Sequence, residues 1–311
     1  MTGYITRYDG SVYRLPALTE WTVIYSSGDC ADSFDVSFAF DRAARAALDG
    51  AVRFRAEHDG ATVFTGVIDE YTVAADRDKA GVSLAGRGMA ALLMDNEAET
   101  ATYPQCTLSD MLARYVEPYG IAIGRTDAMG SLKDYTVSAG TSEWKALCEF
   151  AAWAGGAAPR FGRRGELILA KEPERTVAIS DKNGVRAARF REKRYGVVSE
   201  VLVRGNTDGK MTRVVNETFA ARGGRCRRIV RVPNRTGYDA RRFTGEYVID
   251  RSAREQFRLE LSLAEPFAAF AGDRAVVTLE KLGLDGDFTV SEAVSWADGS
   301  GCGTELTLIR A

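Results

Sequence analysis

Residues 52–70 read VRFRAEHDGATVFTGVIDE, and this stretch predicts a β-hairpin. Apolar and charged side chains alternate over residues 52–57, which is the period-two pattern of a strand with one buried face. Asp59 and Gly60 supply the turn, because Gly accepts a positive φ angle without a Cβ clash. The return strand is apolar on both faces around Gly66, which indicates a bulge, a bend or a close approach of two backbones. A small closed or strongly curved sheet is built in this way.

The composition is that of an ordinary globular protein, with 45% hydrophobic and 27% charged residues. A chain of 311 residues is long enough for two or three domains with a substantial core. Residues 1–15 lack a basic start followed by an apolar run, and no stretch of about 20 apolar residues occurs. We therefore expect no membrane segment and a protein that is assembled in the cytoplasm.

Five cysteines are scattered along the chain, and none falls in a Cys-x-x-Cys pattern. An odd number at wide spacing predicts reduced, mostly buried thiols rather than a disulfide framework or a zinc site. These residues are Cys30, Cys106, Cys148, Cys226 and Cys302.

Charge is distributed unevenly, although the formal net charge is only -2. Residues 160–258 hold 25 Lys and Arg against 12 Asp and Glu, a balance of +13. The rest of the chain holds 16 against 31, a balance of -15. Such an asymmetry favours nucleic-acid binding, or pairing between copies of the chain in which opposite charges meet. A solvated surface of uneven charge is the third interpretation.

Residues 1–95 are predicted to form a mostly β domain. Residues 33–40 alternate apolar and small polar side chains, which indicates a half-buried strand. Asp41 is placed to cap a short helix over residues 42–48, and the hairpin of residues 52–70 follows. Another strand and another short helix are expected at residues 81–86 and 89–94.

Residues 96–190 are predicted to form an α/β domain. Thr107 and Asp110 have the spacing of a capping box at the start of a helix over residues 108–119. A second helix is expected over residues 143–154 and a compact hairpin over residues 157–169.

Residues 191–311 are predicted to return to β structure, so that the fold class is α+β and predominantly β. Turn residues followed by alternating strands recur between residues 272 and 309, which is the rhythm of a small antiparallel barrel. Arg225, Arg227, Arg228 and Arg231 are expected to share one exposed strand face. Strands are expected over residues 197–204, 211–215, 227–232 and 257–263, with a helix over 238–249.

A catalytic constellation cannot be assembled from this sequence. His58 is the only histidine and lies beside the predicted turn, so a Ser-His-Asp or Cys-His device would depend on that one exposed residue. The neighbouring acids Asp69 and Glu70, or Glu97 and Glu99, are more often solvated than catalytic. We therefore predict no enzyme and no catalytic, cofactor-binding or metal-binding residues.

Motifs of one known family follow one another along the chain. They begin with DSFDVSFAF at residues 32–40, FTGVIDE at 64–70 and GRGMAALLMD at 86–95. They continue with the helix around Trp144, the hairpin at residues 159–168, and the segments 272–279, 286–290 and 304–308. In order, spacing and total length, the chain resembles phage tail baseplate hub proteins of the late-control-D-like kind, over nearly its whole length.

This resemblance implies a homotrimer with two tail-tube-like antiparallel β-barrels in each subunit, in residues 1–95 and 191–311, joined by the α/β domain of residues 96–190. Three chains would form a pseudo-sixfold ring, an adaptor between the hexameric tail tube and the trimeric central spike. The implied location is the baseplate of a phage or phage-tail-like particle, such as a bacteriocin or a contractile injection system. Other baseplate proteins and the tape measure protein are further candidate partners.

Two other functions stay open at this point. One is a nucleic-acid-binding protein that uses the basic section, residues 160–258. The other is a tail-associated cell-wall hydrolase, for which the sequence offers no constellation of acids.

Overall fold

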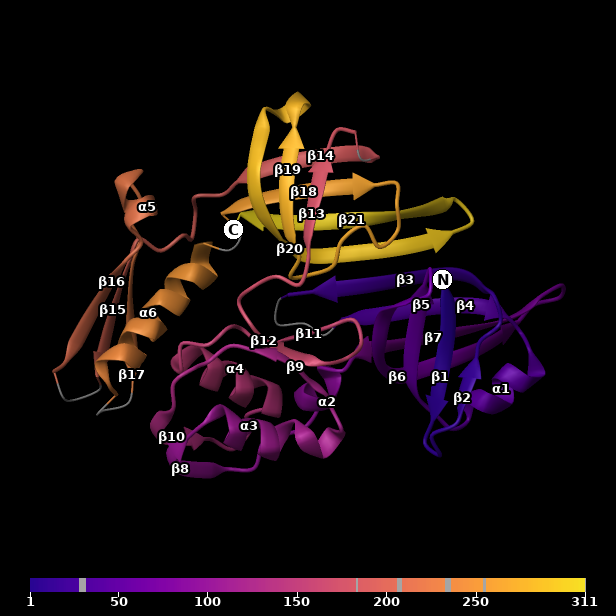
Figure 1. The fold of residues 1–311 in the computed structure, drawn as a ribbon, viewed down its shortest axis with the longest axis horizontal. Helices are drawn as coiled ribbons and strands as arrows, with labels where there is room; N and C mark the ends of the chain where they lie inside the picture. The colour runs from indigo at the N-terminus through magenta and orange to yellow at the C-terminus, as the bar shows by residue number, and fades with distance from the viewer. Residues whose placement is uncertain (28–31, 183, 206–208, 233–235, 254–255, 311) are drawn as a thin grey trace.

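Strands from both ends of the chain join in one 13-stranded sheet (Figure 1). The computed structural model describes residues 1–27, 32–182, 184–205, 209–232, 236–253 and 256–310. The strands of this sheet are β1 (Thr2–Arg7), β2 (Val12–Arg14), β3 (Leu18–Ser26), β4 (Ser33–Ala39), β5 (Ala51–His58), β6 (Ala61–Ala75), β7 (Ala80–Gly88), β13 (Thr176–Ser180), β14 (Val185–Glu192), β18 (Phe257–Leu263), β19 (Arg274–Leu279), β20 (Leu284–Asp298) and β21 (Gly301–Arg310). Their order is β14-β18-β21-β20-β3-β4-β7-β6-β5-β1-β2, while β19 pairs with β20 and β13 with β19.

Two smaller units lie beside the large sheet, each around its own hydrophobic cluster. The first, an α/β unit, contains α2 (Ala91–Met94), α3 (Leu108–Tyr115), the 3-10 turn η1 (Glu117–Tyr119), α4 (Glu143–Trp153), β8 (Ala101–Cys106), β9 (Ile123–Thr126), β10 (Leu132–Val137), β11 (Arg160–Phe161) and β12 (Leu167–Leu169). The second contains β15 (Glu200–Gly205), β16 (Met211–Val215), β17 (Arg227–Val232), α5 (Glu217–Ala221) and α6 (Tyr238–Ala253). In Figure 1 these units are the magenta and the orange parts of the ribbon.

The predicted hairpin is confirmed as β5 and β6, which pair in antiparallel register. Asp59 and Gly60 connect them with φ angles of 50° and 78°, the left-handed pair that a two-residue hairpin loop requires. Gly66 proves to be a point of close backbone approach, because a Cβ there would lie 2.2 Å from the carbonyl oxygen of Arg87. The register shift of β6 lies further on, between Ile68 and Glu70.

The helix-capping predictions are confirmed. The Asp41 side chain accepts a hydrogen bond from the Ala44 backbone N–H at the start of α1 (Arg42–Leu48). Thr107 and Asp110 form both hydrogen bonds of the capping box of α3. The predicted helix over residues 108–119 stops being α-helical at Tyr115 and continues as η1, which has a proline in its first turn.

Four cysteines in the described part of the chain are free thiols. Cys106 is buried, as predicted, whereas Cys148, Cys226 and Cys302 are only half-buried. Cys30 lies outside the described residues. None of the helices in these parts of the chain is long and apolar enough to cross a membrane.

The α+β, predominantly β fold class is confirmed, but neither predicted barrel closes into a ring within the described residues. Strand β20 pairs with β21 along most of its length, with β19 over residues 284–289 and with β3 over residues 292–297. Residues 61–67 of β6 pair with β5, and the rest of the strand pairs only with β7. The large sheet also takes in β13 and β14, which the sequence analysis did not predict. The domain boundaries at residues 95 and 190 stay a prediction.

Two parts of the sheet repeat one topology. The N-terminal unit has the order β3-β4-β7-β6-β5-β1, and the C-terminal unit has the matching order β14-β18-β21-β20-β19-β13. Strands β6 and β20 both have 15 residues and shift register at the same place, before Glu70 and before Glu292. Strands β3 and β14 also shift at the same place, before Glu20 and before Ala187. The units differ at their last strand, since β1 pairs antiparallel and β13 parallel.

Gly66→Ala is expected to lower the free energy of unfolding by about 1–3 kcal/mol, because the added Cβ forces the backbones of β6 and β7 apart. Gly81→Ala in β7 is the matched control, since its Cβ would come no closer than 3.7 Å to the Phe38 carbonyl oxygen. Urea denaturation of both variants measures the difference. Equal midpoints for the two would contradict this account of Gly66.

Candidate assembly surface

The two units meet where β3 pairs with β20, a contact that we call the seam. Its pairs run from Trp21 opposite Ala297 to Ser26 opposite Glu292. In Figure 1 the indigo β3 and the yellow β20 lie side by side at the middle of the molecule. One hydrophobic cluster extends across the seam, from strands of the first 88 residues to strands near the C-terminus. The seam therefore turns two sheets into one continuous surface with a shared core behind it.

A loop between β18 and β19 packs against the core side of the seam. Phe267 stacks on Trp21 with ring centroids 5.0 Å apart, and Phe270 meets Tyr25 edge-on, also at 5.0 Å. The buried Ser295 hydroxyl accepts a hydrogen bond from the Phe267 backbone N–H at 3.0 Å. The buried Thr304 hydroxyl donates to the Glu265 carbonyl at 2.7 Å. The loop thus gives hydrogen bonds to two buried hydroxyls of the C-terminal unit and packs two aromatic rings against β3 of the N-terminal unit. Sequence reasoning missed this role, for which the closely spaced phenylalanines were the only signal.

The other face of the sheet points away from this core and is polar. Side chains alternate between the two faces of each strand, and those on this face are mostly small hydroxyl-bearing residues and acids, with arginines among them on β7, β14 and β18. We call this the outer face. Its residues include Thr22, Ile24, Asp35, Ser37, Glu70, Thr72, Ser83, Ala85, Glu260, Ser262, Glu292, Val294, Glu305 and Thr307.

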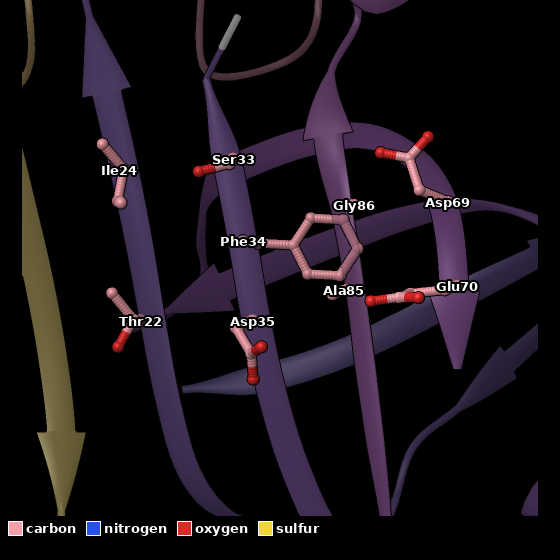
Figure 2. Close-up of a pocket in the computed structure, with 9 residues that line it drawn as sticks. All are labelled: Thr22, Ile24, Ser33, Phe34, Asp35, Asp69, Glu70, Ala85 and Gly86. Carbon is pink, nitrogen blue, oxygen red and sulfur yellow. The ribbon is translucent and has the colours of Figure 1, made fainter. Parts of the chain in front are cut away.

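A hollow of about 380 Å³ lies in the outer face near the bend of β6. Figure 2 shows Asp35 on β4 and Glu70 on β6 beside it, with Ala85 and Gly86 between them on β7. Gly86 is a second point of close backbone approach, since a Cβ there would lie 2.0 Å from the Val67 carbonyl oxygen. The hollow is shallow, and no group of three His, Cys, Asp or Glu in the described residues is placed to hold a metal ion.

Two of the acids considered as catalytic residues, Asp69 and Glu99, each form an ion pair with an arginine. Asp69 accepts two hydrogen bonds from the Arg87 guanidinium, at 2.8 and 3.0 Å. Glu99 pairs with Arg114 at 2.8 Å. His58 is half-buried rather than exposed, with its ring 5.1 Å from that of Phe267. Asp69 and Glu70 both line the hollow of the outer face, but the Asp69 carboxylate is held in its ion pair with Arg87. Glu99 and His58 lie elsewhere, in contacts of their own.

The basic section does not place its arginines on one strand face, contrary to the prediction. Arg227 and Arg231 lie on one face of β17, and alternation puts Arg228 on the other. The Arg227 guanidinium is paired with Glu200, which also binds Arg213. Several further arginines of this section are likewise engaged, as in the ion pair of Arg175 with the buried Asp273.

Charged side chains connect the α/β unit to the seam region. The guanidinium of Arg163 lies 4.7 Å from the Phe270 ring centroid, and that of Arg175 lies 5.5 Å from it. Burial raises the pKa of Asp273, whose carboxylate accepts a hydrogen bond from the Phe270 N–H. Burial also raises the pKa of Asp32 to about 7, against the opposing effect of a hydrogen bond from the Ser26 N–H. Two acids at this contact are therefore held in an environment that disfavours their charge.

No protein-family model matches the chain, and no curated protein matches it in sequence. Solved structures do match. A 43 kDa tail protein of prophage MuSo2 from Shewanella oneidensis has a TM-score of 0.77 at 18% identity, over 100% of this chain and 98% of its own. A tail protein from Neisseria meningitidis has a TM-score of 0.76 at 19% identity, over 99% of this chain and 96% of its own. The chain has the fold of phage tail proteins.

A third structure with this phage tail fold is a component of the type VI secretion system of E. coli, described as similar to the T4 bacteriophage tail proteins gp27 and gp5. Its TM-score is 0.58 at 12% identity, over 94% of this chain and 73% of its own. The predicted resemblance to phage tail and baseplate proteins is therefore confirmed at the level of the fold.

Asp32→Asn is expected to make stability less dependent on pH. The folded protein holds a proton on Asp32 up to about pH 7, whereas the unfolded chain releases it near pH 4. The free energy of unfolding of the wild type therefore falls as pH rises from about 4 to about 7. The Asn side chain does not ionise, so the variant does not lose this stability, and its amide oxygen can still accept the hydrogen bond from the Ser26 N–H. At pH 8 the variant should be more stable by on the order of 2 kcal/mol or more, and at pH 4 it should match the wild type.

Urea midpoints at both pH values measure the effect. Asp78→Asn, in the exposed turn after β6, is the control and should leave both midpoints unchanged. A wild type and an Asp32→Asn variant that are equally stable at pH 8 would refute the burial argument.

Proposed function

We propose that this protein is the structural hub of a phage or phage-tail-like baseplate, a homotrimeric adaptor that joins the hexameric tail tube to the trimeric central spike. The observation that carries the proposal is the repeated topology of the N-terminal and C-terminal units. Three chains with two equivalent units each present six units to the tube and three copies to the spike. We propose that each unit is a tail-tube-like barrel element, completed only in the assembled ring.

We propose that in such a ring the outer face lines the central channel, because the shared core of the two units lies behind the sheet. The outer face carries arginines beside its carboxylates, and several of them are paired with acids, as Arg189 and Arg258 are with Glu260. Arginines of the basic section that are held in ion pairs within the chain favour the hub over a nucleic-acid-binding role.

The remaining parts of the proposal follow from this position. The role is structural and not enzymatic, and two of the acids considered for a hydrolase, Asp69 and Glu99, are each held by an arginine. The partners are the tail tube protein, the central spike protein and other baseplate proteins, with the tape measure protein as a further candidate. The site of action is the baseplate of the particle, which is assembled in the bacterial cytoplasm.

The purified chain, alone or with the tube and spike proteins produced alongside it, is expected to form a trimer of about three times its 33.8 kDa mass. Sedimentation velocity measures the mass of the chain, and co-purification tests the two partners. Electron microscopy of the particle then locates the ring between tube and spike. A chain that stays monomeric and binds neither protein would rule out the hub.

A further inference from the structure

One half of β6 lacks the neighbour that the repeated topology provides elsewhere. In the C-terminal unit, residues 292–297 of β20 pair with β21 on one side and with β3 across the seam on the other. In the N-terminal unit, residues 70–75 of β6 occupy the equivalent place and pair with β7. Their other edge has no strand partner among the described residues. A row of backbone N–H and C=O groups is therefore open at this edge.

Strand β14 has the complementary open edge. It is the counterpart of β3, and in the described parts of the chain it pairs only with β18. The edge of β3 that corresponds to the free edge of β14 is the one that pairs with β20 in the seam. The chain thus carries both halves of a second seam, at opposite ends of its sheet.

We propose that residues 70–75 of one copy pair in antiparallel register with β14 of a second copy and so reproduce the seam between subunits. The inference rests on the proposed trimer, in which this head-to-tail contact repeats until the ring closes. A heterologous contact of this kind, once closed into a ring, leaves neither of these two edges open.

Matching rows of paired residues set the register of this intersubunit seam. Residues that pair across successive strands of the N-terminal unit form the row Thr22, Asp35, Ala85 and Glu70. The equivalent row in the C-terminal unit is Arg189, Glu260, Thr307 and Glu292. At the seam Glu292 faces Ser26, four residues after Thr22. The equivalent partner of Glu70 is therefore Lys193, four residues after Arg189. Because the two strands run antiparallel, Val73, three residues after Glu70, then faces Phe190, three residues before Lys193.

The side chains on the two edges are complementary in this register. On the outer face, Glu70 lies opposite Lys193, and the neighbouring Arg191 and Arg189 lie opposite Thr72 and Ala74. On the core side, Val73 and Phe190 are 40% and 39% exposed in the single chain. Their counterparts at the seam, Ser295 and Val23, are fully buried. Pairing would cover two apolar side chains that otherwise face water.

Charge reversal tests the register. Glu70→Lys and Lys193→Glu should each weaken self-association at low salt by about tenfold or more, because each places like charges opposite one another. The double variant should restore association, which a merely misfolded protein would not do. Glu117→Lys, an exposed acid in the α/β unit, is the control and should leave association unchanged. Sedimentation velocity over a dilution series measures all four against the wild type.

Disulfide trapping provides a second and independent measurement. Directly opposed residues in antiparallel strands have Cα atoms about 4.5–5.5 Å apart, within disulfide reach. A chain with Val73→Cys and Phe190→Cys should give linked dimers and trimers on a non-reducing gel. A chain with Val73→Cys and Arg191→Cys places the thiols on opposite faces and should give no more product than the wild type, whose own cysteines set the background.

The results separate this interface from the hub itself. The proposed seam is overturned, even if the chain is trimeric, when two results occur together. Self-association is unchanged by either charge reversal, and cysteines at positions 73 and 190 give no more cross-linked product than the wild type. Restored association in the double variant or a specific cross-link supports it. A trimer built through other surfaces would leave the hub proposal intact, and only failure to join the tube and spike proteins would remove that.

Discussion

Antiparallel pairing of β3 with β20 ties residues near the start of the chain to residues near its end, and most of the fold takes its form from this contact. Each unit can make its local hairpins alone, such as β5 with β6 or β20 with β21. Without the seam, however, the rings of Trp21 and Tyr25 would lack Phe267 and Phe270 as partners. Loop closure over so long a segment costs entropy that grows only slowly with length. Shared apolar burial on the core side is large enough to offset it.

Buried polar groups give the seam its specificity. Ser295 and Thr304 lie inside an apolar cluster, where an unpaired hydroxyl would cost about 1–3 kcal/mol. The two hydroxyls bond to each other at 3.2 Å, and the loop after β18 completes their hydrogen bonds with backbone groups of Glu265 and Phe267. The same loop carries the ring on which Arg163 and Arg175 of the neighbouring region lie. Core packing, loop conformation and the contact with the α/β unit are thus coupled.

Local features were predictable from the sequence and distant ones were not. The turn at Asp59 and Gly60 and the capping box at Thr107 are decided by a few neighbouring residues, and both occur as expected. Strand β14 was not predicted, because its sequence VRAARFRE has the composition of a solvated segment. A strand at the edge of a sheet can have such a composition, since charged residues protect the open edge. The pairing of β3 with β20 leaves no trace in either segment alone. Its strongest signal was indirect, in two sections whose β patterns looked alike.

The divergence between the two units explains why their edges differ in chemistry. Strand β3 always finds β20 of its own chain, so its edge carries the apolar Trp21, Val23 and Tyr25 at buried positions. Strand β14 holds the same place in the C-terminal unit, but the equivalent edge has no strand partner among the described residues. Arg189 and Arg191 keep that edge soluble and discourage pairing with arbitrary strands. In the proposed seam between subunits, Lys193 would meet Glu70 of the second copy, so the charge on this edge would also help to select its partner.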